Sequence, residues 1–509
     1  MSDRFEIAFA PLNTEPETAT VVLASDGLVL GSKGREFDTK SASAISKAAA
    51  AADFKGKYKS SIEILAPAKL GIDRLIVSGL GKVGSLTEQQ AVDLGGAIVA
   101  AIQARKSSSA SVIVDVEGSE TLSANEIAAL IGQGAMLRHY NFKKYHTKKS
   151  SEDGNEQEGL KKLVIQVANP DKAKAAFQPL KAVANGVNLA RDLVNEPANI
   201  LGPVELAEKT KALEKLGVDV EILDVKDMEK LGMGSLLSVG QGSVRPSRLA
   251  VMVWNGAKGS KKQKPVCFVG KGVVFDTGGI SIKPAAGMED MKGDMGGAAA
   301  VIGTMHALAE RKANVNAVGL IGCVENMPSG TATRPGDIVK SMSGQTIEVI
   351  NTDAEGRMVL ADVLWYAQDK FKPKLVIDLA TLTGAIMVAL GKEYAGLFSN
   401  EDKLADELLS ASRSTGEKLW RMPLDKAFDK AMDSKNADMK NAGGRWAGAA
   451  TAAAFLQRFV QKDTPWSHID LAGTAMDGNR NDTNQSWGAG WGVRLLNAFV
   501  AEHHEKGEK

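Results

Sequence analysis

The chain has 509 residues, of which 44% are hydrophobic and 24% charged, so its composition is that of a globular protein rather than a disordered or fibrous one. Its 62 lysine and arginine residues almost balance its 61 acidic residues, which excludes a strong overall field for nucleic acid or membrane. Length alone predicts about three domains, whereas the order of the elements below predicts two.

The cysteines and the chain start indicate a reducing compartment. Cys267 and Cys323 stand in apolar runs, so we expect two small buried thiols. The sequence has no apolar run of about 18 residues that could span a bilayer. The first residues lack the basic and then apolar pattern of a secretory signal. We therefore expect a cytoplasmic protein with no membrane segment.

The first part of the chain, residues 1–170, alternates between strand-like and helix-like patterns. Strands are expected at 19–23, 61–65, 74–78, 111–116 and 163–168, and helices at 41–52, 88–103 and 124–137. Ser123 and Glu126 have the spacing of a capping box before the last of these helices. The alternation predicts a smaller N-terminal α/β domain with a mainly parallel sheet.

One motif in this domain is similar to a nucleotide-binding loop. Gly79, Gly81 and Gly84 fit the pattern GxGxxG after a predicted strand. A dinucleotide site also requires its third glycine at a helix start and an acidic residue about 20 positions later. The helix is expected to begin after Thr87, and Asp115 comes too late. We interpret the motif as an ordinary turn.

Residues 143–197 are expected to lead out of this domain. Residues 143–149 are basic and residues 150–159 polar and acidic, which is typical of a solvated loop; contact with DNA or RNA phosphates is the alternative. Residues 171–195 predict a linking helix with a kink or break at Pro179.

The last part, residues 196–509, predicts a larger α/β domain with a mixed, mainly parallel sheet. Strands are expected at 218–223, 249–254, 266–270, 315–322, 346–350 and 375–380, and helices at 296–311, 358–371, 404–412, 447–460 and from about 492. Lys271 and Asp353 each follow closely after an expected strand. Because ligands bind at the carboxyl ends of strands in open α/β sheets, we expect these two loops to converge.

Four carboxylates on glycine-rich turns indicate a metal site: Asp276, Asp294, Asp353 and Glu355. Each alone is most simply a solvated surface charge. Together they would repel one another strongly unless cations lay among them. Their hard oxygen atoms suit Mg, Mn or Zn. Two divalent ions roughly 3.5–4 Å apart could share one activated water.

At these residues the chain resembles a known family. NTDAEGRM at 351–358 is similar to the signature of the leucine aminopeptidases, the dinuclear cytosol-type metallopeptidases, with Met358 where leucine is usual. VGKGVVFDTGGISIK, DMKGDMGGAAA and DLATLTGA resemble other segments of that family. The resemblance covers residues 190–500, and it implies a metallopeptidase fold for the larger domain.

The resemblance implies a ligand set for two metal ions, Zn or Mn. Asp276 and Glu355 would bridge the ions, Lys271 and Asp294 would complete one, and Asp353 would hold the other. Lys271 would bind as a neutral amine, so its pKa would have to fall well below the ordinary value of about 10.4. Burial and two adjacent cations act in that direction.

The family also implies how the chemistry would proceed. Lys283 would stabilise the oxyanion of a tetrahedral intermediate, and Arg357 would hold a bicarbonate ion that acts as general base. His306, on an expected helix, and His468, on an expected strand, are rivals for that role. We interpret both as structural.

Peptides with a free α-amine and a leucine-like first residue are the substrates that the resemblance implies. The pocket for that residue would draw on Met291, Thr381, Leu382, Gly384 and Ala472. The family also implies a homohexamer with active sites facing an interior cavity. Some bacterial members bind DNA, but the sequence does not indicate whether this chain does.

Two other functions remain open from the residues. A two-metal phosphoesterase could use the same carboxylates and basic groups, although the histidine-rich ligand sets common in such sites are missing and a lysine ligand is unexplained. A DNA-binding scaffold that keeps the peptidase fold is the second alternative.

Overall fold

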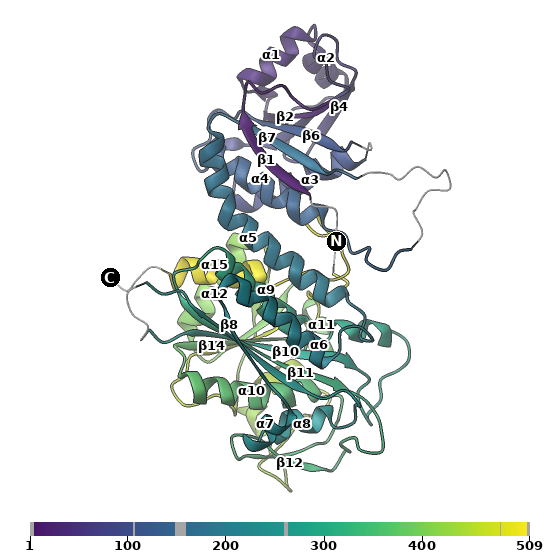
Figure 1. Cartoon of the computed structure of the whole chain (residues 1–509), viewed down its shortest axis with the longest axis vertical. Coiled ribbons are helices and arrows are strands. Elements are labelled where there is room, and N and C mark those ends of the chain that lie inside the picture. Colours follow the sequence, from purple (N-terminus) through teal and green to yellow (C-terminus); the bar gives the residue numbers. More distant parts are fainter. Residues whose placement is uncertain (1–4, 105–106, 148–158, 259–262, 479, 506–509) are drawn as a thin grey trace. The chain divides into compact units, whose positions relative to one another are not determined.

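The computed structural model describes residues 5–104, 107–147, 159–258, 263–478 and 480–505 (Figure 1). Contacts divide the chain into two compact units. The first contains Met1–Ala184 and Arg480–Ser486, and the second contains Asn185–Asn479 and Trp487–Lys509. The short segment Arg480–Ser486 therefore belongs to the first unit although its sequence neighbours belong to the second.

The first unit is built on a seven-stranded sheet with the order β1-β7-β6-β2-β5-β4, and β3 pairs with β2. Strands β1, β7, β6, β2 and β5 are parallel neighbours, while β3 and β4 are antiparallel to theirs. Its elements are β1 (Glu6–Pro11), β2 (Ala19–Ser25), β3 (Val29–Leu30), α1 (Ser32–Lys40), α2 (Ala44–Ala51), β4 (Ser61–Leu65), β5 (Arg74–Gly81), α3 (Glu88–Gln103), β6 (Ser109–Val114), α4 (Ala124–His139) and β7 (Lys162–Val167). The predicted α/β fold is confirmed, but β1 and α1 were not predicted.

The glycine motif of this unit does not open the following α-helix, as interpreted from the sequence, but it is not a bare turn either: Gly79 and Gly81 belong to β5, and Gly84 lies in a short 3₁₀ helix, η1 (Val83–Ser85). Strand β5 runs through Gly79 to Gly81, and α3 begins only after Thr87, which caps it in a capping box with Gln90. A Cβ at Gly79 would lie 2.0 Å from the carbonyl oxygen of Lys57, so close backbone packing explains this glycine. Asp115 accepts the backbone N–H of Lys33 at 2.8 Å, at the start of α1.

Helix α5 (Pro170–Asn195) belongs to both units, because the boundary between them falls at Ala184 and Asn185. It is one helix with Pro179 inside it, so the alternative of a break at this proline is wrong (Figure 1). Residues 148–158, which contain most of the polar and acidic loop and the last two lysines of the basic stretch considered for DNA contact, lie outside the described residues. Among the helices that the structure describes, none is both long and apolar enough to cross a membrane.

The second unit contains an eight-stranded sheet with the order β16-β15-β18-β14-β10-β11-β9-β8 and a three-stranded sheet with the order β12-β13-β17. In the larger sheet β18, β14, β10 and β11 are parallel neighbours, and β8, β9 and β15 have antiparallel neighbours. The strands are β8 (Asp219–Leu223), β9 (Arg248–Asn255), β10 (Val266–Asp276), β11 (Asn316–Asn326), β12 (Ile338–Lys340), β13 (Thr346–Glu348), β14 (Leu375–Ala380), β15 (Ala395–Ser399), β16 (Leu419–Arg421), β17 (Met439–Lys440) and β18 (Trp466–Asp470). The mixed, mainly parallel sheet that the sequence predicted is confirmed.

Helices cover this sheet. They are α6 (Pro203–Thr210), α7 (Val225–Lys230), α8 (Gly234–Gly240), α9 (Gly296–Glu310), α10 (Glu355–Phe371), α11 (Gly384–Leu390), α12 (Asp402–Thr415), α13 (Lys426–Lys430), α14 (Gly448–Gln457) and α15 (Val493–His503). The two expected buried thiols, Cys267 on β10 and Cys323 on β11, are free and buried.

Helices α9 and α10 pack on opposite faces of β10. A Cβ at Gly270 would lie 2.6 Å from Cα of Ala298, so this glycine lets α9 approach the strand closely. Successive side chains of a strand point to opposite faces. The side chain of Lys271 accordingly lies on the other face, where a Cβ at Gly356 of α10 would meet it at 2.7 Å. The two glycines make room for a helix on one side and a lysine on the other.

Candidate metal centre

Lys271 and Asp276 lie in the same strand. The sequence predicted that this strand ends at Gly270, but β10 continues through Lys271 to Asp276. Both side chains are buried, each residue being 2% exposed. Lys271 is therefore held by strand pairing with Gly322 of β11 rather than by a loop.

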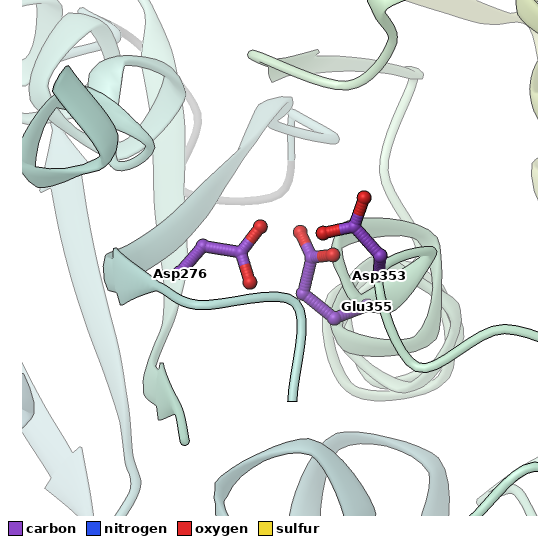
Figure 2. A group of neighbouring side chains, drawn as sticks. All are labelled: Asp276, Asp353 and Glu355. Atoms are coloured by element: carbon purple, nitrogen blue, oxygen red, sulfur yellow. The ribbon is translucent and has the colours of Figure 1, made fainter. Parts of the chain in front are cut away.

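The other three carboxylates lie where elements begin or end. Asp294 follows a 3₁₀ helix, η3 (Met288–Gly293). Glu355 is the first residue of α10, two positions after Asp353. Figure 2 shows the carboxylates of Asp276, Asp353 and Glu355 directed toward one another, and one oxygen of each lies within 4.8 Å of the others.

Two lysines bind these carboxylates. Lys271 Nζ lies 2.8 Å from Asp294 Oδ1 and 2.7 Å from Glu355 Oε1, and it also donates to the Thr381 carbonyl at 2.8 Å. Lys283 Nζ lies 2.8 Å from Asp276 Oδ2 and also pairs with Asp353. All five predicted metal ligands and Lys283 thus form one cluster.

Burial shapes the electrostatics of this cluster. Burial raises the pKa of Asp276, Asp294 and Asp353 above the ordinary value, most strongly for Asp294. For Lys271, burial by itself would lower the pKa, but Asp294 and Glu355 outweigh it and raise the pKa above the ordinary value. A neutral amine at Lys271 therefore requires further positive charge beside it.

The residues present fit a pair of divalent ions. Asp294 Oδ2 is buried and has no hydrogen-bond partner within the described part of the chain. The carboxylates outnumber the two lysines, so cations among them would relieve their repulsion. Carboxylate oxygens with one amine nitrogen suit Mg, Mn or Zn.

Further polar groups orient the carboxylates. Asn326 Nδ2 donates to Asp276 Oδ1 at 2.8 Å, and the backbone N–H of Gly278 donates to the same oxygen at 2.9 Å. The Thr381 hydroxyl donates to Asp294 Oδ1 at 2.7 Å. Thr381 was predicted to contact substrate, but both its hydroxyl and its carbonyl are bonded within the cluster.

Arg357 lies on α10 and is 7% exposed. Its Nη1 donates to the Asn441 carbonyl at 2.9 Å, whereas its Nε has no partner among the residues that the structure describes. Burial lowers the pKa of Arg357 to about 10, against the opposing effect of Glu355 and Asp470. The guanidinium is therefore charged at neutral pH, with its Nε–H unpaired within the described residues.

One cavity of about 570 Å³ contains the whole site. That volume is typical of a small-molecule site. It is lined by every predicted site residue: Lys271, Asp276, Lys283, Met291, Asp294, Asp353, Glu355, Arg357, Thr381, Leu382, Gly384 and Ala472. The residues predicted from separate motifs therefore line the same cavity.

The cavity also has walls that were not predicted. Met288 and Met387 line it together with Met291, and residues 442–444 form another part of the wall. A Gly-Gly run such as Gly443-Gly444 is typical of a loop, but nothing in it indicates which site the loop would reach. From sequence alone, a methionine reads equally well as a core residue.

The two histidines considered as bases are structural. His468 on β18 is fully buried, and its Nδ1 lies 2.6 Å from Asp378 Oδ1. His306 on α9 lies 3.5 Å from Glu310, four residues along the same helix. Neither lines the cavity described above.

The predicted convergence of the two loops is confirmed, but the reason given for it is partly wrong. Asp276 ends β10 of the eight-stranded sheet, whereas Asp353 follows β13, which belongs to the three-stranded sheet. The Asn326 amide joins the two, because it also donates to the Thr352 carbonyl at 3.1 Å. The loops therefore do not meet as neighbours along one sheet edge.

Comparison with known proteins decides the family. Residues 188–497 match the catalytic domain of the cytosol aminopeptidase family, and residues 21–149 match the N-terminal domain of that family. The chain belongs to the cytosol aminopeptidase family. The resemblance inferred from NTDAEGRM is thereby confirmed. Members of the cytosol aminopeptidase family are hydrolases, and dependence on two metal ions is typical of them.

Relatives of this family match the chain over its whole length. The probable cytosol aminopeptidase of Chelativorans sp. (strain BNC1) is 58% identical over 99% of this chain and 100% of that protein. That of Rhizobium leguminosarum bv. trifolii (strain WSM2304) is 56% identical over the same shares. A solved mutant of tomato leucine aminopeptidase is 33% identical, with a TM-score of 0.85 over 99% of this chain and 98% of that one. The bottromycin maturation enzyme BotP in complex with Mn is 31% identical, with a TM-score of 0.82 over 95% and 99%.

Proposed function

We propose that this family member releases N-terminal amino acids, leucine-like ones preferred, from peptides by means of two bound divalent ions. The observation that carries the proposal is the pairing of Lys271 with both Asp294 and Glu355 at one end of a cavity. A lysine ligand has no explanation in a phosphoesterase, whereas it belongs to the peptidase signature. The match to the cytosol aminopeptidase family also favours peptide hydrolysis.

Five side chains would hold the ions. Asp276 and Glu355 would lie between the two, Lys271 and Asp294 would complete one, and Asp353 the other. When bound, two ions lower the pKa of a shared water and polarise the substrate carbonyl. Zn or Mn is proposed, and a Mn-containing structure of a relative supports the second.

Lys283 and Arg357 supply fixed positive charge. Burial alone would lower the pKa of Lys283, but Asp276 and Glu355 raise it, so its ammonium stays protonated at neutral pH. From the cavity wall it would stabilise the oxyanion, a contribution of about 3 kcal/mol. Arg357 would hold a bicarbonate ion through its unpaired Nε, and that ion would accept the proton.

Substrate selection would follow from the apolar wall. Met291 and Ala472 line the cavity beside Leu382 and Gly384. A flexible thioether adapts to branched or unbranched apolar side chains, which supports a preference for leucine-like residues. We further propose a homohexamer in the cytoplasm. DNA binding by the chain is a separate proposal, for which residues 143–147 are the basic stretch within the described part.

The experiment compares two substrates. Purified protein with Mn or Zn is assayed on leucine p-nitroanilide and on p-nitrophenyl phosphate, with metal analysis of the same samples. We expect cleavage of the anilide alone, and its loss in Glu355→Ala. Glu348→Ala is the matched control, because Glu348 lies on β13 and does not line the cavity. Full anilide activity in Glu355→Ala, or preferential cleavage of the phosphate, would refute the proposal.

A further inference from the structure

Asn441 is a buried polar residue to which the chemistry above assigns no part. It follows β17, which pairs with β13 in the three-stranded sheet, and it is 0% exposed. Its backbone N–H donates to the Glu348 carbonyl at 3.0 Å, which extends that pairing by one residue. The strand pair therefore places Asn441 at the start of the loop that carries Asp353 and leads into Glu355.

The side chain of Asn441 is bonded entirely to this loop. Its Oδ1 accepts the backbone N–H groups of Ile350 at 2.8 Å and Asn351 at 3.2 Å. Its Nδ2 donates to the carbonyls of Asn351 at 2.7 Å and Ala354 at 3.5 Å. Ile350 and Asn351 lie outside any helix or strand, so the Asn441 side chain supplies backbone partners that secondary structure does not. One amide thus binds the loop on both sides of Asp353.

The backbone of Asn441 reaches Arg357 as well. Its carbonyl accepts the Arg357 Nη1 hydrogen bond at 2.9 Å. The same residue therefore bonds both the loop that carries Asp353 and the guanidinium of Arg357, two residues after Glu355. The cavity wall of residues 442–444 follows directly.

We propose that Asn441 is a positioning residue, which fixes the 350–354 loop and Arg357 so that Asp353 and Glu355 meet Asp276 in a geometry that binds divalent metal. The effect on metal binding and loop order stands on these contacts alone. The effect on catalysis rests on the proposed function. Residues that orient metal ligands typically account for 10–100-fold in metal affinity or activity.

The first experiment measures metal binding and kinetics of Asn441→Ala, which removes the amide but keeps the backbone groups. We expect Mn²⁺ affinity by calorimetry to fall about 10–100-fold. With saturating Mn²⁺, kcat for leucine p-nitroanilide should fall by a similar factor while KM changes less than about threefold, because Met291 lies in η3 and Ala472 follows β18, outside the loop that Asn441 bonds. Asn441→Asp keeps the acceptor but loses both donors, so it should not restore either value.

Asn316→Ala is the matched control. Asn316 is also a buried asparagine of this unit, 7% exposed, and its amide bonds the backbone of Gln263 and Ala257, but it lies at the opposite end of β11 from Asn326. Its loss should lower thermal stability without changing Mn²⁺ affinity or kcat. Equal changes in metal affinity in the two variants would overturn the proposal, since a general loss of packing would then explain both.

A second measurement needs neither metal nor activity. Amide hydrogen exchange at Ile350 and Asn351 should be faster in Asn441→Ala than in the wild type, with chelator present in both. Unchanged exchange together with unchanged Mn²⁺ affinity would refute the role of Asn441. If the wild type failed to cleave the anilide, only the proposed function would fall, because exchange and metal titration would still decide the positioning role.

Discussion

Lys271 Nζ lies 2.7 Å from Glu355 Oε1, with both residues buried. These residues come from a strand and a helix start that are far apart in the sequence. The pair joins the two motifs on which the metal assignment depends. The stability of the folded protein should therefore depend on the buried ammonium group of Lys271.

Replacing Lys271 by methionine leaves Asp294 and Glu355 buried without their cation. Breaking a buried ion pair in this way typically costs about 3–5 kcal/mol. We expect Lys271→Met to lower the free energy of unfolding in urea by that amount when chelator is present. Lys283→Met should cost less, because the Lys283 side chain is 21% exposed and water reaches it. Equal stability of Lys271→Met and the wild type would contradict the ion-pair assignment.

Gly356→Ala separates stability from metal binding. A Cβ there would lie 2.7 Å from Cδ and Cε of Lys271, so the amine must move. Alanine favours a helix over glycine by up to about 1 kcal/mol, which offsets part of the strain. We expect Mn²⁺ affinity to fall at least about tenfold with a small change in thermal stability. Gly330→Ala, where a Cβ meets nothing within 4 Å, is the control and should change neither quantity.

Arg357→Ala tests whether Arg357 holds a bicarbonate ion. If the unpaired Nε holds bicarbonate, wild-type activity on leucine p-nitroanilide should rise with added bicarbonate in carbonate-free buffer. The variant should lose this stimulation and about 100-fold in kcat, as when a general base is removed. Metal content, measured alongside, should stay the same. Stimulation of equal size in both proteins would place the anion elsewhere.

Asp362 should make the folding stability of the second unit depend on pH. This carboxyl on α10 is fully buried, and burial raises its pKa to about 7 although the N–H groups of Leu236 and Met342 oppose the rise. The folded protein then binds the proton more tightly than the unfolded chain, so stability falls as pH rises from about 4 through about 7. The total is about 4 kcal/mol at most. Asp362→Asn should flatten the urea stability curve over that window; an unchanged slope would mean that Asp362 is ionised throughout.

Much of the fold was predictable where local patterns are strong. Residues 61–65, 88–103 and 375–380 form a strand, a helix and a strand with the predicted limits. Helix α1 was missed because only Gly34 and Phe37 in it are buried, which leaves too few apolar positions for a helical period.

The extension of β10 was not predictable from its own residues. A charged lysine between two glycines reads as the end of an apolar strand. Lys271 stays in the strand because Asp294 and Glu355, both distant in sequence, compensate its charge. Long-range pairing of this kind leaves no local signal.

The proposed ligand residues could be picked out because four carboxylates on glycine-rich turns indicate a metal site and their motifs resemble a known family, whereas Asn441 could not. An asparagine before a glycine-rich run reads as loop. Its importance comes from bonds to the backbone of Ile350, Asn351 and Ala354, and backbone groups do not depend on which side chains they carry. Residues that act through the main chain of a distant loop are therefore the part of a site that sequence patterns omit.

The segment Arg480–Ser486 delays completion of the first unit during synthesis of the protein. Asp482 pairs with Lys59 and the Asn481 carbonyl accepts from Arg138, so the first unit lacks these bonds until the ribosome has made nearly the whole polypeptide. A nascent chain that ends after α5 would contain the first unit without the segment Arg480–Ser486. Proteolysis between residues 479 and 487 should accordingly loosen the amino-terminal unit.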